Sequence, residues 1–210
     1  ELKYHVRKTI AMKKIILFFV MILVVFSTSP VYGHKLISHN DSHKSFETAL
    51  NIPDHKISWA IYENIDPFQT KFYTFDAKQG ELFYSSIVIP KLDRLENFKP
   101  SIALIGEGIE IQNNHSLDEP LPDGGMVVFD YTGEIPSKEF YEPFGQATYW
   151  DRQEIQITIP QDGTYYLAVF DTQGFEGKYS LAVGKIESFS FIDLVTILPT
   201  AWLDTKFFFE

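Results

Sequence analysis

The sequence predicts an all-β protein, an antiparallel jelly-roll-type β-sandwich with an N-terminal signal helix and a short amphipathic C-terminal helix. About eight short runs of strand-forming residues follow one another along the chain, separated by turn signals, and no convincing amphipathic helix lies between them. The clearest run covers residues 165–170, where two sets of side chains alternate with the period of two that a half-buried strand shows. One set is Tyr165, Leu167 and Val169, and the other is Tyr166, Ala168 and Phe170.

Turn residues separate the other predicted strands. Pro160-Gln161-Asp162-Gly163 and the glycine-marked segment 171–177 divide residues 155–184 into three runs, and Lys78-Gln79-Gly80 marks an earlier turn. Residues 110–123 are polar and contain prolines, which predicts a surface loop, and residues 132–152 show no clean period of either kind. Earlier strands are predicted at 57–62, 71–77, 81–89, 101–105 and 126–131.

The N-terminal residues are typical of a secretory signal. Met12-Lys13-Lys14 precedes an uncharged apolar run at 15–26, and small residues lead to an expected cleavage site after Gly33. An uncleaved membrane anchor is the alternative, since the apolar run is short for a membrane span. The expected organisation is a signal peptide at 1–33, with 1–11 as an upstream extension, a flexible leader at 34–51, the sandwich at 52–186 and an amphipathic tail at 187–210.

Charge and cysteine content restrict the partners and the compartment. Cleavage after Gly33 would remove five basic residues and one acidic residue, which changes the net charge from −10 to −14. A surface with this much negative charge repels phosphate backbones and anionic lipid, and this argues against nucleic-acid binding. The sequence has no cysteine, so the exported chain would depend on core burial rather than on disulfides, as at a microbial cell surface.

The C-terminal tail contains an apolar stripe at helical spacing. Asp193, Thr196, Thr200 and Asp204 take the opposite side, and Pro199 should bend or interrupt the helix. Three interpretations remain open: a flap over one face of the sandwich, an interfacial helix that contacts a membrane or a partner, and a transmembrane anchor. The stripe consists of Phe191, Leu194, Val195, Leu198 and Trp202.

Two stretches carry a resemblance to a known family. The first is Phe72-Tyr73-Thr74-Phe75-Asp76-Ala77 followed by Gly80, and the second is Asp162-Gly163-Thr164-Tyr165-Tyr166-Leu167-Ala168-Val169 followed by Gly177-Lys178-Tyr179-Ser180-Leu181. Together they resemble the bacterial pre-peptidase C-terminal domain, a jelly-roll sandwich of secreted microbial proteins. The resemblance covers roughly residues 57–184 and implies the fold, whereas fold alone does not imply an activity. Residues 106–152 depart from the family pattern.

The part of the chain that departs from the family is also the best candidate for a ligand site. Aromatic rings can stack on a sugar, and neighbouring carboxylates and an arginine can bind its hydroxyl groups. The alternative is a lid whose aromatic residues pack onto the sandwich. On the first interpretation, replacing Trp150 and Tyr141 by alanine would abolish binding without unfolding the domain. The candidates are Tyr141, Glu142, Phe144, Tyr149, Trp150 and Arg152.

Metal chemistry is a weaker hypothesis. Calcium would need several converging oxygens, and the sequence shows no EF-hand spacing. Cleavage after Gly33 would make His34 the N-terminal residue, and its amine and imidazole would resemble the copper site of lytic polysaccharide monooxygenases. The second imidazole would come from His39, His43, His55 or His115, and a solvated histidine in a flexible leader is the alternative.

The sequence thus favours a non-catalytic extracellular binding or interaction module at the cell surface, with a carbohydrate or a protein as its ligand. It contains no G-x-S-x-G, H-E-x-x-H or P-loop motif and no cysteine nucleophile. The alternatives are a secreted metalloenzyme with copper at His34, and an accessory subunit of a membrane complex docked through the tail.

Overall fold

The computed structural model describes residues 13–14, 34–111, 117–143, 145–188, 203–206 and 208–209. The chain separates into two compact units, Glu1–Tyr32 and Gly33–Glu210. In the first unit the described residues are Lys13 and Lys14, both helical, so most of the predicted signal peptide lies outside the described residues. Within the described parts of the chain, no helix is long and apolar enough to cross a membrane.

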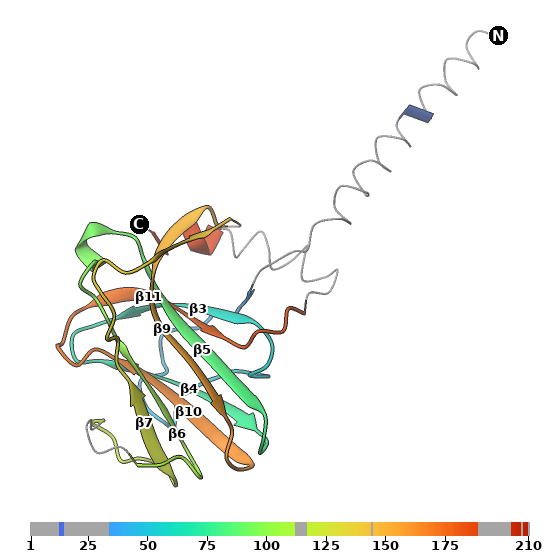
Figure 1. Cartoon of the computed structure of the whole chain (residues 1–210), viewed down its shortest axis with the longest axis vertical. Coiled ribbons are helices and arrows are strands. Elements are labelled where there is room, and N and C mark those ends of the chain that lie inside the picture. Colours follow the sequence, from blue (N-terminus) through green and yellow to red (C-terminus); the bar gives the residue numbers. More distant parts are fainter. Residues whose placement is uncertain are drawn as a thin grey trace. The chain divides into compact units, whose positions relative to one another are not determined.

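The second unit is a β-sandwich, as predicted (Figure 1). Its two sheets have the strand orders β1-β3-β11-β5-β9-β8 and β2-β4-β10-β6-β7. A 3-10 helix, η1 (Asp93–Leu95), lies between β5 and β6. The strands are β1 (Lys35–Leu36), β2 (Leu50–Asn51), β3 (Trp59–Ile65), β4 (Thr70–Ala77), β5 (Leu82–Pro90), β6 (Ser101–Gly106), β7 (Gly125–Phe129), β8 (Glu139–Glu142), β9 (Ala147–Thr158), β10 (Gly163–Phe170) and β11 (Gly177–Val183).

The topology is that of a jelly roll. Without β1, β2 and β8, the strands pair first with last: β3 with β11, β4 with β10, β5 with β9, and β6 with β7, all antiparallel. A long hairpin wrapped around a core gives this pattern. The prediction of an antiparallel sandwich is confirmed for these strands, while the short edge strands β1 and β2 pair in parallel with β3 and β4.

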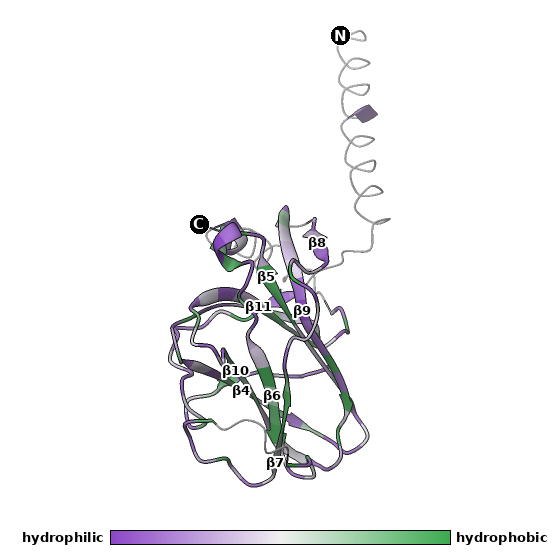
Figure 2. Cartoon of the chain, turned by 60° about the vertical axis from the view of Figure 1, so that its left-hand side comes forward, coloured by the Kyte–Doolittle hydropathy of each residue, from purple (hydrophilic) through white to green (hydrophobic). Residues whose placement is uncertain are grey.

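Alternation within each strand supplies the core between the sheets. Tyr165, Leu167 and Val169 of β10 are fully buried, as their period of two predicts. Figure 2 shows hydrophobic residues along β5 and β6, in contrast with the hydrophilic strand β8. The inward-facing residues include Ile61, Phe83, Ile87 and Leu181 from one sheet and Tyr73, Phe75, Leu104 and Leu167 from the other.

The prediction of a flexible leader at 34–51 is wrong. β1 and β2 are edge strands of different sheets, so residues 37–49 between them, here called the crossing segment, pass from one sheet to the other. Ile37 and Leu50 pack against the core, and His43 is only 1% exposed. The polar composition of this segment predicts exposure to solvent, but His43 is buried and forms its hydrogen bond with Glu63 instead of with water.

The described end of the C-terminal tail packs on the six-stranded sheet. Residues 203–206 and 208 are helical. The ring of Phe208 stacks on Tyr62 with 4.8 Å between ring centroids, and the Tyr62 hydroxyl is 2.8 Å from Thr205 Oγ1. These contacts hold the described end of the chain against β3. The five predicted contact residues of the tail, Phe191, Leu194, Val195, Leu198 and Trp202, lie outside the described residues.

Candidate functional site

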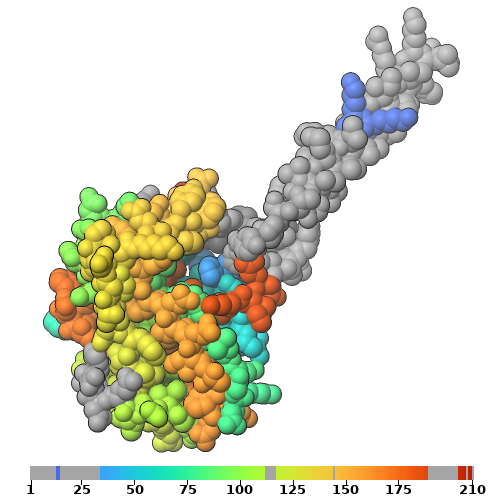
Figure 3. Space-filling model, in the orientation of Figure 1, coloured from blue at the N-terminus to red at the C-terminus, as the bar shows by residue number. Residues whose placement is uncertain are grey.

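Four connections gather at one end of the sandwich, here called the loop end: residues 66–69, 91–100, 130–146 and 171–176. They meet because β3, β5, β7 and β10 all finish at this end in the antiparallel pairing of the sheets. In the space-filling view, residues 91–100 (green), 130–146 (yellow) and 171–176 (orange) form the upper and left surface of the sandwich (Figure 3). Loops held on a rigid sandwich are frequent binding sites.

The loop end carries the exposed aromatic residues of the described chain. Phe68 is 75% exposed, Tyr141 57%, Phe175 47% and Phe140 42%. The large apolar residues exposed near the opposite end, including Leu82 and Ile111, are aliphatic. Exposing rings of this size to water is unfavourable, so their concentration at one end makes the loop end the candidate binding surface.

Local backbone geometry fixes the loop that carries Phe175 against the ring of Phe68. Gly174 has a φ of +73°, and a side chain there would collide with the ring of Phe68, so this position requires glycine on both counts. The Asp171 carboxylate accepts the backbone N–H groups of Gln173 at 2.9 Å and Phe175 at 3.0 Å. The 171–176 loop is therefore fixed in shape, and its Gly174, the neighbour of Phe175 in the chain, lies against the ring of Phe68.

A hollow of about 410 Å³ adjoins Phe175. Its walls come from three of the four connections and combine apolar and charged side chains, as a protein-binding surface does. The lining residues include Arg94, Lys99, Ile135, Gln173, Phe175 and Glu176.

The structure separates the predicted ligand-binding residues. Tyr141 is exposed on β8, whereas Tyr149, Trp150 and Arg152 on β9 are only 2%, 4% and 6% exposed. Tyr149 packs under the tail with Phe208, and Trp150 belongs to the main core. The half-buried Glu142 accepts the backbone N–H of Gly145. Phe144 lies outside the described residues. These three side chains are buried as parts of strand β9 itself, an arrangement that neither the binding face nor the loop lid of the sequence analysis describes.

Arg152 positions the loop end instead of facing solvent. Its Nε donates to the Phe98 carbonyl at 2.9 Å and its Nη2 to the Glu96 carbonyl at 2.8 Å, while Nη1 donates to Ser137 Oγ. The guanidinium also lies 5.3 Å from the centroid of the Tyr131 ring. Burial lowers the pKa of Arg152, but an arginine stays charged in water at any ordinary pH. One side chain thus ties residues 91–100 to residues 130–146.

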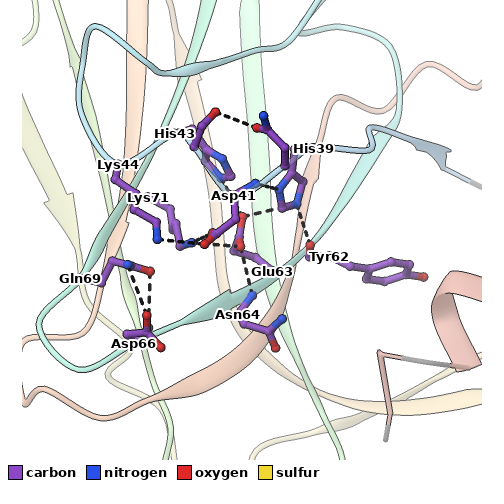
Figure 4. Close-up of polar contacts among 12 residues, drawn as sticks. His39, Asp41, His43, Lys44, Tyr62, Glu63, Asn64, Asp66, Gln69 and Lys71 are labelled. Carbon is purple, nitrogen blue, oxygen red and sulfur yellow. Dashed lines mark hydrogen bonds and ion pairs between the residues drawn. The ribbon is translucent and has the colours of Figure 1, made fainter.

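The histidines also differ from their predicted arrangement. His34 Nδ1 is 2.6 Å from Ser58 Oγ, and His55 Nε2 is 3.0 Å from Glu81 Oε2. His115 lies outside the described residues. Among the residues described, the potential metal ligands that come together are His39, His43 and Glu63, without His34 (Figure 4). No pattern in the sequence connected Glu63, inside a strand, with the two histidines.

Comparison with known proteins gives distant structural likenesses alone. No protein family matches the sequence, and no curated protein matches it. PliG of Salmonella Typhimurium, a periplasmic inhibitor of g-type lysozyme, is 20% identical, with 65% of this chain and 98% of that chain covered and a TM-score of 0.36. CorA of Methylomicrobium album BG8, a surface-associated copper-binding protein, is 11% identical, with 65% and 98% covered and a TM-score of 0.32.

The pre-peptidase C-terminal domain of a Bacillus anthracis collagenase is also similar. It is 14% identical, with 63% of this chain and 91% of that chain covered and a TM-score of 0.31. The resemblance drawn from the sequence is therefore confirmed as a likeness between the chains. At these scores and identities, none of the three proteins supports an inference about what this chain binds.

Proposed function

We propose that this chain is an exported, non-catalytic binding module that holds a protein partner at the cell surface through its loop end. The observation that carries the proposal is the gathering of exposed aromatic residues on the loops and on the edge strand β8 of this end, which internal contacts keep in shape. Phe68, Phe140, Tyr141 and Phe175 all lie there. Export rests on the signal-like residues 12–33.

A protein fits this surface better than a carbohydrate. Sugar-binding faces use the broad rings of tryptophan and tyrosine with polar groups beside them. Here Tyr149 and Trp150 are buried, and three of the four exposed rings belong to phenylalanine, which has no polar tip. Phenylalanine beside arginine, lysine and glutamate, as around the hollow at Phe175, matches the apolar centre and charged rim of protein interfaces.

The loops of the loop end are already held in one conformation in the free protein. Asp171 and Arg152 fix the loops before any partner arrives, so binding would lose little conformational entropy. Truncating an aromatic anchor at the centre of such a surface should then cost affinity without affecting the fold.

Binding of the labelled chain to the cell envelope of its producing organism tests the proposal. The wild type is compared with a Phe68→Ser, Phe175→Ser double variant, and with a Leu82→Ser, Ile111→Ser control. The control residues are 50% and 68% exposed and lie toward the other end of the sandwich. We expect affinity to fall about tenfold in the first variant and to stay unchanged in the control.

Two results would count against the proposal. Equal affinities for the wild type and the Phe68→Ser, Phe175→Ser variant would remove the loop end as the binding surface. Binding that persists after the envelope proteins have been digested, and that a polysaccharide fraction competes away, would identify a carbohydrate ligand instead.

A further inference from the structure

The crossing segment brings two histidines to a glutamate inside the sandwich. β3 and β4 lie in different sheets, and the crossing segment spans the gap between them. Glu63 of β3 is only 2% exposed, and His39 and His43 of the crossing segment both approach it (Figure 4). One potential ligand atom from each of the three residues lies within 4.8 Å of the others.

The spacing is close to what a single cation needs. His43 Nε2 is 2.7 Å from Glu63 Oε2, and His39 Nε2 is 3.5 Å from the same oxygen. Ligands in a tetrahedral site with bonds of about 2.0–2.2 Å lie roughly 3.4 Å apart. Small side-chain shifts would therefore suffice to place all three atoms around one ion. The Tyr62 carbonyl oxygen, 2.9 Å from His39 Nε2, is a further oxygen at the same place.

The charges at the cluster are balanced. Lys71 is fully buried, with Nζ 3.3 Å from Glu63 Oε1, and it also pairs with Asp41. Asp41 is about half exposed and pairs with Lys44 at the surface as well, at 2.9 Å. A cation would therefore bind Glu63 in competition with Lys71, and the arrangement of the ligand atoms, rather than net charge, supports a site.

The hydrogen bonds of the histidines allow the exchange of a proton for a metal. His43 Nδ1 is buried and has no hydrogen-bond partner among the described residues, so Glu63 alone sets its tautomer. A cation at Nε2 would shift the proton to Nδ1 without breaking a hydrogen bond there. His39 has to give up two contacts, the hydrogen bond from its Nε2–H to the Tyr62 carbonyl at 2.9 Å and the longer contact of its Nδ1 with the Asp41 amide at 3.3 Å.

We propose that His39, His43 and Glu63 form a binding site for one Zn²⁺ or Cu²⁺ ion. Two imidazoles with one carboxylate suit these late first-row cations better than Ca²⁺ or Mg²⁺, which take oxygen ligands. Since the ligands come from the crossing segment and from β3, the ion would fasten this segment across the open side of the sandwich. The site is independent of the loop-end proposal, and either can fail alone.

Calorimetric titration of the untagged full chain with ZnCl₂ and with CuCl₂ tests the site. We expect one ion per chain and a rise in the melting temperature on addition of the metal. His39→Ala is the informative variant, because this side chain is 13% exposed and its removal leaves His43 paired with Glu63. Affinity should fall by about tenfold or more in His39→Ala. It should stay unchanged in the control His34→Ala, because His34 lies outside the cluster and pairs with Ser58.

An NMR measurement on the wild-type chain tests the site without any variant that would first have to fold. Substoichiometric Cu²⁺ should broaden the NMR signals of the His39 and His43 rings before those of His34 and His55. The site is refuted if binding is not saturable, if His39→Ala binds as tightly as the wild type, or if His34→Ala loses the metal instead.

Discussion

Replacing Trp150 by alanine tests whether β9 forms part of the core or of a ligand-binding face. Trp150 is 4% exposed and belongs to the main core cluster, so the substitution leaves a large cavity. Removing a buried tryptophan costs about 3–5 kcal/mol of unfolding free energy. Trp150 Nε1 has no hydrogen-bond partner in the described part of the chain, so its loss relieves an unpaired donor. We therefore expect the lower value, about 3 kcal/mol.

The assay is thermal and urea unfolding followed by circular dichroism. For a chain of this size, a loss of about 3 kcal/mol lowers the melting temperature by roughly 6–12 °C. Tyr141→Ala is the matched control, because this aromatic side chain is 57% exposed and its removal should change stability by less than about 0.5 kcal/mol. Equal stabilities of Trp150→Ala and the wild type, with loss of envelope binding, would refute this assignment and restore the original ligand-face hypothesis.

Two further predictions concern groups that hold loops and turns. Arg152→Lys keeps the charge, but a lysine cannot donate to the Phe98 and Glu96 carbonyls together. The free energy of unfolding, measured with urea, should therefore fall by about 3 kcal/mol. An unchanged urea midpoint would contradict the role given to Arg152. Hydrogen bonds from the Lys78 amide and from His55 and Lys56 lower the pKa of Glu81 to about 2. Because the unfolded value is about 4.3, the stability from Glu81 is complete above this pH and is lost as the pH falls toward 2. Glu81→Gln should therefore cost about 1 kcal/mol at pH 7 and almost nothing at pH 2, and a difference independent of pH would contradict this account.

The sequence predicted the sandwich well because alternation and turn residues are local signals. The strands at 71–77, 81–89 and 101–105 lie within a residue of β4, β5 and β6. The start of β9 was missed, since Ala147–Trp150 lie inside the segment 132–152 that shows no clean period, and their burial comes partly from the tail and β8. Tertiary contacts of this kind leave no periodic trace in the sequence.

The candidate sites were less predictable. Sequence analysis recognised the concentration of aromatic residues at 132–152 but could not tell which of them continue a buried strand. Phe68 and Phe175 stand far apart in the sequence, and only the pairing of β3 with β11 brings their turns together. In the same way, polar residues at 34–51 gave the composition of a solvated leader. In the structure His43 pairs with Glu63 of β3, and Glu63 in turn pairs with Lys71 of β4, a strand of the other sheet.

The most direct test of the central claim is hydroxyl-radical footprinting of the chain, free and bound to the envelope fraction. We predict that binding reduces oxidation of Phe68, Tyr141 and Phe175 by about threefold, since an interface core excludes water. Leu82 and Ile111, exposed away from the loop end, should be oxidised equally in both states. Protection of Leu82 and Ile111 with unchanged oxidation of Phe68 and Phe175 would contradict the account and move the binding surface to the opposite end of the sandwich.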